Sequence, residues 1–202
     1  MEINFNLFKQ ATDLMETHGF QYVIFGGIAV WAYGRQRNTK DIDILMKAEQ
    51  ANDALLAFLQ DGWTTKRTDE AWLFQATKED VQVDLIFQAK GDFSLTDDII
   101  RRARILTISD YKFKVISPED LILIKMHAIK EIRPQDWYDA VSVIKGIKGN
   151  LDWDYIEEKG RQSPERVLSF LLFSTDEGAR EYIPRRVIKA LSNFVLEENK
   201  VA

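Results

Sequence analysis

Apolar positions along the chain predict helices and strands in its first half and helices alone in its second. Residues 6–18 carry apolar side chains at helical spacing, and Tyr22–Phe25 is a short apolar run typical of a buried strand. Asp41–Met46 alternates acidic and apolar residues, which is the period of a strand. The pattern also predicts helices at 28–33 and 51–59, strands at 71–76, 81–87, 105–108 and 112–116, and a loop at 88–98.

From Ser117 onward the pattern is that of helices throughout. Ser117 suits an N-cap, Pro118 the first helical position, and Glu119 and Asp120 the first turn. We predict helices at 118–131, 135–146, about 152–160, 164–173 and 184–196. The chain is therefore expected to be an α+β protein, with an α/β core at 1–116 and a helical region at 117–202.

Composition narrows the classes of protein and of site. The chain has 202 residues, of which 46% are hydrophobic and 29% charged, as in ordinary globular proteins. A formal net charge of −5 argues against strong non-specific binding of nucleic acid. There are no cysteines and two histidines, His18 and His127, so a bound metal would be held by oxygen ligands. Such ligands favour Mg²⁺ or Mn²⁺.

The first ten residues, MEINFNLFKQ, lack a basic region followed by an apolar run. No stretch approaches 18 uninterrupted apolar residues. We therefore expect a cytoplasmic protein that does not span a membrane.

Asp41 and Asp43 are the main candidates for chemistry. They lie two positions apart on a predicted strand, so their side chains point to the same face. Like charges at about 4 Å repel by roughly 4 kcal/mol at an effective dielectric near 20, and a divalent cation removes that cost. Asp84 lies in a second predicted strand and becomes a third carboxylate of the cluster if the two strands pair. A solvated strand face explains an isolated D-x-D equally well.

Two neighbouring segments favour phosphate chemistry. Gly26 and Gly27 follow a buried strand and precede a helix, where backbone N–H groups can face an anion, although many such turns contain glycine for steric reasons alone. Arg37 and Lys40 lead into Asp41, and both can neutralise phosphate. A solvated loop is the alternative for these two residues.

Together, Gly26-Gly27, Asp41/Asp43 and Asp84 resemble the signature of the nucleotidyltransferase superfamily related to DNA polymerase β. The run from Arg37 to Ile44 looks like the minimal prokaryotic branch, which includes antibiotic nucleotidyltransferases and toxin–antitoxin enzymes. Ile124-Lys125-Met126-His127-Ala128, followed by Asp136-Trp137-Tyr138-Asp139, is similar to later motifs of abortive-infection (AbiEii-type) nucleotidyltransferase toxins. The alternative for this helical pair is ordinary amphipathic packing, although Lys125 within an apolar run needs a partner or a water-lined cleft.

The resemblance implies a nucleotidyltransferase fold, with a mixed β-sheet, flanking helices and a C-terminal helical bundle that completes the nucleotide cleft. It also implies Mg²⁺- or Mn²⁺-dependent transfer of NMP from an NTP to a hydroxyl group. The implied metal-binding and catalytic residues are Asp41, Asp43 and Asp84, and the implied nucleotide-binding residues are Gly26, Gly27, Arg37, Thr39, Lys125 and Asp136.

The acceptor stays open at this point. RNA, and tRNA in particular, is favoured by the toxin resemblance, which also brings a cognate antitoxin as a partner. A small hydroxylated compound such as an antibiotic is the first alternative, and a protein hydroxyl group is another. A non-catalytic nucleotide-binding module of the same fold is the rival from a different class.

Overall fold

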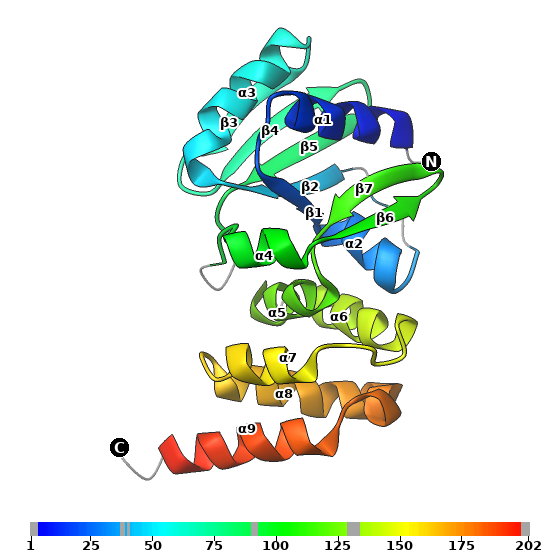
Figure 1. The fold of residues 1–202 in the computed structure, drawn as a ribbon, viewed down its shortest axis with the longest axis vertical. Helices are drawn as coiled ribbons and strands as arrows, with labels where there is room; N and C mark the ends of the chain where they lie inside the picture. Colours follow the sequence, from blue (N-terminus) through cyan, green and yellow to red (C-terminus); the bar gives the residue numbers. More distant parts are fainter. Residues whose placement is uncertain (1–3, 37–38, 40, 90–92, 129–133, 199–202) are drawn as a thin grey trace. The chain divides into compact units, whose positions relative to one another are not determined.

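The computed structural model describes residues 4–36, 39, 41–89, 93–128 and 134–198 (Figure 1). The chain divides into two compact units. The first comprises residues 1–32 and 36–117, and the second comprises residues 33–35 and 118–202. The first unit combines a sheet with helices, and the second consists of helices.

Within the described residues, the first unit contains a mixed seven-stranded sheet in the order β3-β4-β5-β2-β1-β7-β6. Its strands are β1 (Tyr22–Phe25), β2 (Asp41–Met46), β3 (Thr64–Asp69), β4 (Leu73–Lys78), β5 (Val81–Ile86), β6 (Arg104–Ile108) and β7 (Tyr111–Val115). Strand β2 runs parallel to β5 and antiparallel to β1, while β1 runs parallel to β7. This mixed sheet with flanking helices confirms the predicted α+β class.

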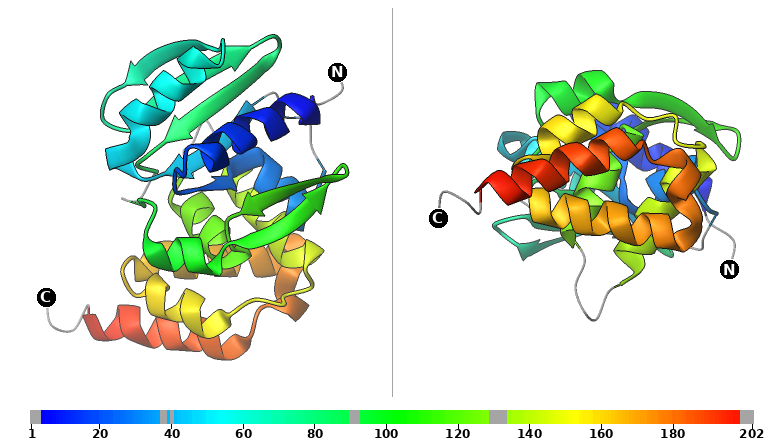
Figure 2. Two further views of the ribbon diagram at one scale, coloured as in Figure 1. Left: turned by 45° about the horizontal axis from the view of Figure 1, so that its top comes forward. Right: turned by 90° about the horizontal axis from the view of Figure 1, so that it is seen from below.

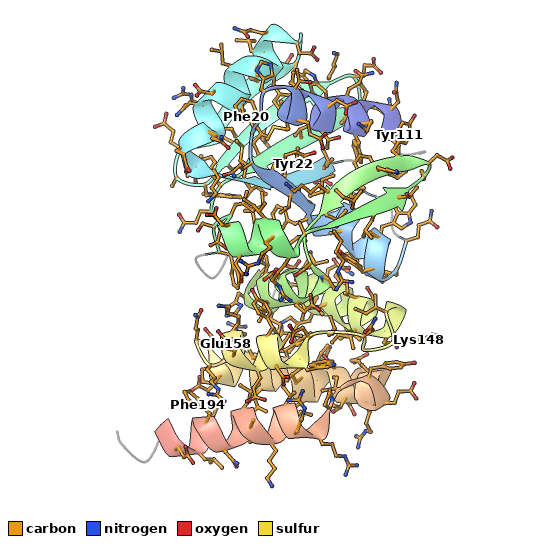
Figure 3. All side chains as sticks on the ribbon, in the orientation of Figure 1. Phe20, Tyr22, Tyr111, Lys148, Glu158 and Phe194 are labelled. Carbon is orange, nitrogen blue, oxygen red and sulfur yellow. The ribbon has the colours of Figure 1, made fainter. Side chains whose placement is uncertain are left out.

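Helices α1 (Phe5–Thr17) and α3 (Ala51–Gln60) pack on one face of this sheet (Figure 1). Ile42, Ile44 and Val83 are fully buried, and they alternate with the acidic residues of β2 and β5. Tyr22 of β1 lies within the first unit (Figure 3). Its hydroxyl donates to Glu16 Oε1 of α1 at 2.9 Å. The apolar residues of the two central strands thus build the core and leave the acidic residues on the other face.

Two elements of the first unit were not predicted from the sequence pattern. Strand β3 has mostly exposed side chains and no apolar alternation, because it is an edge strand held by its pairing with β4. Helix α4 (Asp97–Arg102) lies in and beyond the predicted loop; Thr96 accepts a hydrogen bond from the Ile99 N–H at its start. Acids in its first turn and arginines in its last also stabilise it.

The second unit contains α5 (Pro118–Ala128), α6 (Gln135–Gly146), α7 (Trp153–Gly160), α8 (Pro164–Ser174) and α9 (Arg185–Glu198). Helices α8 and α9 lie side by side (Figure 2). The predicted helix 118–131 begins where expected, and residues 129–131 lie outside the described residues. Gly178, with φ of +80°, interrupts the helical backbone within Thr175–Ala179, and the 3₁₀ turn that follows at Arg180–Tyr182 was not predicted.

The first turn of α5 is buried, although its acids were expected only to favour the helix start. Glu119 Oε1 accepts a hydrogen bond from the Asp152 N–H at 2.9 Å, and Asp120 Oδ1 accepts one from the Tyr155 hydroxyl at 2.6 Å. These acids therefore link α5 to α7 by hydrogen bonds.

Among the described residues, no helix combines the length and the apolar composition that crossing a bilayer requires.

Candidate active site

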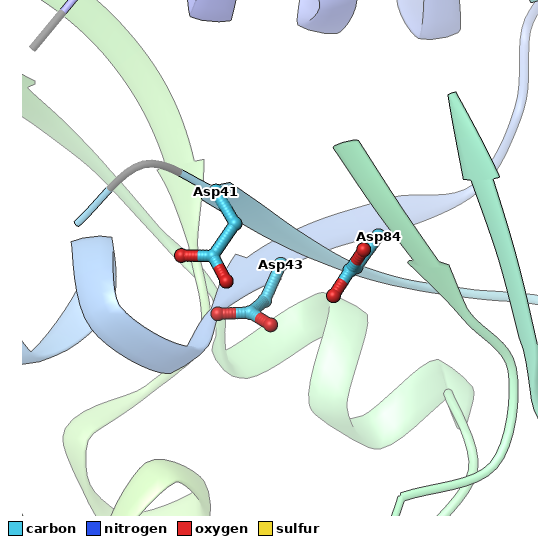
Figure 4. A group of neighbouring side chains, drawn as sticks. All are labelled: Asp41, Asp43 and Asp84. Carbon is cyan, nitrogen blue, oxygen red and sulfur yellow. The ribbon is translucent and has the colours of Figure 1, made fainter. Parts of the chain in front are cut away.

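Three carboxylates of the first unit gather on one face of the sheet. In the pairing of β2 with β5, Asp43 lies opposite Asp84 and Asp41 lies opposite Gln82. Because side chains alternate along a strand, all four point to the same face. One carboxylate oxygen each from Asp41, Asp43 and Asp84 lies within 4.8 Å of the others (Figure 4). The structure thus brings together the three acids that the sequence singled out.

This cluster fits a hard divalent cation. Its three candidate ligand atoms are carboxylate oxygens, the type that Mg²⁺ and Mn²⁺ prefer. Three half-buried acids this close repel one another without a cation. Burial raises the pKa of Asp84, hydrogen bonds from Gln75 and Gln82 lower it, and the charge of Asp41 raises it, leaving the pKa above its ordinary value.

The glycine turn before α2 (Gly26–Tyr33) lies directly against Asp43. The Gly27 N–H donates to Asp43 Oδ2 at 3.2 Å. Gly26 has φ of +60°, and a Cβ atom there would come within 1.8 Å of that same oxygen. Only glycine meets both conditions. The sequence predicted that this turn faces phosphate, and the structure directs the Gly27 N–H to a carboxylate of the cluster.

Thr39 is buried beside Asp41. Its hydroxyl donates to Asp41 Oδ1 at 2.5 Å and lies 3.2 Å from the Asp41 carbonyl oxygen. Its contact in the structure is therefore with a candidate metal ligand, whereas the sequence predicted a role in nucleotide binding. Arg37 and Lys40, the residues of this segment predicted to neutralise phosphate, lie outside the described residues.

Two glutamines at the cluster were not predicted. The side-chain amides of Gln75 on β4 and Gln82 on β5 each donate to Asp84 Oδ1 at 2.8 Å. The Thr68 hydroxyl lies 2.6 Å from Gln75 Oε1. Gln82 lies two residues before Asp84 on one strand face, so the period alone could have identified it. Gln75 could be found only from the register of β4 against β5, in which it lies opposite Asp84.

In the second unit, Lys125 and Asp136 form a buried ion pair. Lys125 Nζ lies 2.7 Å from Asp136 Oδ1 and 3.3 Å from Asp139 Oδ2. Asp139 Oδ1 accepts hydrogen bonds from Arg35 Nη2 at 3.2 Å and Gln135 Nε2 at 2.9 Å. Lys125 thus has the partner that its apolar surroundings require. The predicted contact of Lys125 and Asp136 with nucleotide stays a prediction.

A match to one family model shows which family the chain belongs to. The model of nucleotidyl transferases of unknown function (DUF2204) matches residues 4–173. The chain belongs to this family. The predicted place in the nucleotidyltransferase superfamily and the predicted enzyme class are thereby confirmed. The finer resemblance to abortive-infection toxins stays a prediction.

Solved structures show the same nucleotidyltransferase fold. A lincosamide antibiotic adenylyltransferase, LnuA, bound to lincomycin, is 20% identical with a TM-score of 0.55, over 73% of this chain and 99% of that one. The antibiotic-resistance factor ANT(2″)-Ia is 16% identical with a TM-score of 0.55, over 88% and 94%. An antigenic nucleotidyltransferase-like protein from Paracoccidioides brasiliensis is 15% identical with a TM-score of 0.50, over 91% and 88%. No curated protein matches at the level of sequence.

Proposed function

We propose that this nucleotidyl transferase moves NMP from an NTP onto a hydroxyl acceptor in a reaction that depends on a divalent metal. The observation that carries the proposal is the cluster of Asp41, Asp43 and Asp84, with one ligand oxygen from each within 4.8 Å of the others. Mg²⁺ or Mn²⁺ bound there would offset the charge of the phosphate oxygens and lower the pKa of the acceptor hydroxyl.

The side chains of the cluster would divide the remaining tasks. Asp41 and Asp43 would hold the cation, oriented by the Thr39 hydroxyl and the Gly27 N–H. Asp84 would be the third carboxylate ligand of the cation and would favour deprotonation of the acceptor hydroxyl, whose proton leaves to solvent as the acceptor oxygen bonds to the α-phosphorus. The bond from the α-phosphorus to the bridging oxygen would then break, and pyrophosphate would leave.

For the acceptor, we favour a small hydroxylated molecule. Structures of the same fold include an adenylyltransferase bound to the antibiotic lincomycin and the antibiotic-resistance factor ANT(2″)-Ia. The net charge of −5 also works against a polyanionic acceptor. These observations support a compact neutral or cationic acceptor over RNA.

RNA is the second candidate, with tRNA as its form in a toxin. It is favoured by a local concentration of basic residues: Arg101 and Arg102 of α4, Arg104 of β6, and Lys112 and Lys114 of β7. On this alternative, the resemblance to toxin enzymes would bring a cognate antitoxin as a partner.

Transfer of label from α-³²P-labelled NTPs tests the proposal and separates the acceptors. The protein is incubated with each NTP and Mg²⁺, together with lincosamides, aminoglycosides or total RNA. A labelled small product supports the first candidate, and a labelled RNA band supports the second. Binding of NTP without transfer to any acceptor would instead favour a non-catalytic module. Asp53→Asn, at an exposed position of α3, is the matched control for Asp43→Asn.

A further inference from the structure

We propose that Gln75 and Gln82 are positioning residues that hold Asp84 by one oxygen and leave its other oxygen to bind the metal. This inference rests on the proposed function, because it concerns the same three carboxylates. It adds two side chains that do not bind the cation themselves and a specific mode of binding by Asp84.

The hydrogen bonds converge on a single atom. Gln75 Nε2 and Gln82 Nε2 both lie 2.8 Å from Asp84 Oδ1. Within the described part of the chain, Asp84 accepts hydrogen bonds from these two amides alone, and none reaches Asp84 Oδ2. A carboxylate oxygen that accepts two N–H donors has little capacity left for a cation, so the second oxygen is the metal ligand.

The sheet explains why the two oxygens differ. Strand β5 lies between β4 and β2, and Asp84 lies opposite Gln75 on one side and Asp43 on the other. A donor on β4 therefore draws one oxygen away from β2, and the second oxygen is turned toward Asp43. Figure 4 shows one oxygen of Asp84 directed at Asp43 and the other directed away.

The orientation of the Gln75 amide is itself fixed. The Thr68 hydroxyl donates to Gln75 Oε1 at 2.6 Å, which directs the amide nitrogen toward Asp84. Thr68 lies where the pairing of β3 with β4 shifts register between Arg67 and Asp69. Thr68, Gln75 and Asp84 thus form a directed chain of hydrogen bonds across β3, β4 and β5. Side chains that orient metal ligands in this way commonly change metal affinity by about 10–100-fold when removed.

Affinity for Mn²⁺, measured by electron paramagnetic resonance without substrate, tests this inference on the whole chain. Gln75→Leu and Gln82→Leu are each expected to raise the Mn²⁺ dissociation constant by about 10-fold or more. The matched control is Gln10→Leu, at an exposed position of α1, which should leave it unchanged. In the transfer reaction, both site variants should need more Mg²⁺ and recover kcat when Mg²⁺ is raised.

The outcomes separate this inference from the proposed function. If wild-type protein binds Mn²⁺ and Asp43→Asn abolishes that binding, unchanged affinity in folded Gln75→Leu and Gln82→Leu overturns the positioning role alone. If Asp43→Asn leaves Mn²⁺ binding intact, the assignment of the metal site to these three carboxylates is wrong. Should Gln75→Leu fail to fold, Gln82→Leu makes the same test, because its amide donates to the same oxygen.

Discussion

At the scale of single residues, each acid of the cluster has a neighbour that fixes one of its oxygens. Thr39 holds Asp41, the Gly27 N–H holds Asp43, and the two glutamines hold Asp84. Such contacts keep the ligand atoms in place before a cation arrives, which lowers the cost of ordering them on binding.

Gly26→Ala is expected to destabilise the protein and to weaken metal binding. A positive φ costs a non-glycine residue about 1–2 kcal/mol, and the added Cβ would also displace Asp43. Gly19→Ala is a matched control, because Gly19 has φ of +69° but nothing within 4 Å of its Cβ position. Urea unfolding and Mn²⁺ titration should show a similar backbone penalty in both variants and a loss of affinity in Gly26→Ala alone. Equal Mn²⁺ affinity in the two variants would contradict the steric argument.

Asp84→Asn is expected to stabilise the metal-free protein at neutral pH. Burial raises the folded-state pKa of Asp84, so protonation of its carboxyl group stabilises the folded protein. That stabilisation is complete below the ordinary pKa of ~3.9 and is lost as pH rises through the raised value. The asparagine does not titrate, and its oxygen still accepts from both glutamines. Solvent screening at this half-buried position keeps the gain small, so we expect a modest rise in Tm.

Thermal melts in EDTA across pH check this expectation. The difference in Tm between Asp84→Asn and wild type should be smallest below pH ~3.9 and should grow with rising pH to a plateau. A difference that shrinks as pH rises would contradict the raised pKa.

At the scale of elements, period-two alternation was enough to place Asp41 and Asp43 on one face of β2 and Asp84 on one face of β5. Register was not accessible in this way, because it depends on pairing between segments far apart in the chain. Gln75 was not predicted for this reason, because it becomes a neighbour of Asp84 only once β4 pairs with β5. Strand β3 was missed for a related reason, since an exposed edge strand needs no apolar alternation.

The α5–α6 pair makes a prediction about Lys125. Lys125→Met should leave the buried carboxylates of Asp136 and Asp139 without their lysine, at a cost of about 3–5 kcal/mol in unfolding free energy. Lys159→Met, at a more exposed position of α7, is the control and should stay within about 0.5 kcal/mol. Chemical denaturation measures both. If Lys125→Met keeps full stability but loses NTP affinity, Lys125 serves the nucleotide and not the packing of α5 on α6.

At the scale of the whole molecule, the family establishes nucleotidyl transfer as the class of activity, and the solved structures share the fold. This class could be predicted from the sequence, because the motifs that identify it lie in the two strands that carry the acids and in the glycine turn. The acceptor was not accessible in the same way, because no motif in the chain is tied to one acceptor chemistry. Residues 174–202 lie beyond the family match.

Comparing α-³²P- and γ-³²P-labelled NTP in one transfer assay tests the central claim most directly, because it identifies the bond that breaks. We predict that label reaches the acceptor from the α-position only, that EDTA abolishes transfer, and that Asp43→Asn lowers the rate by at least about 100-fold while Asp53→Asn does not. Transfer of the γ-label, or a full rate in EDTA or in folded Asp43→Asn, would contradict metal-dependent nucleotidyl transfer at Asp41, Asp43 and Asp84.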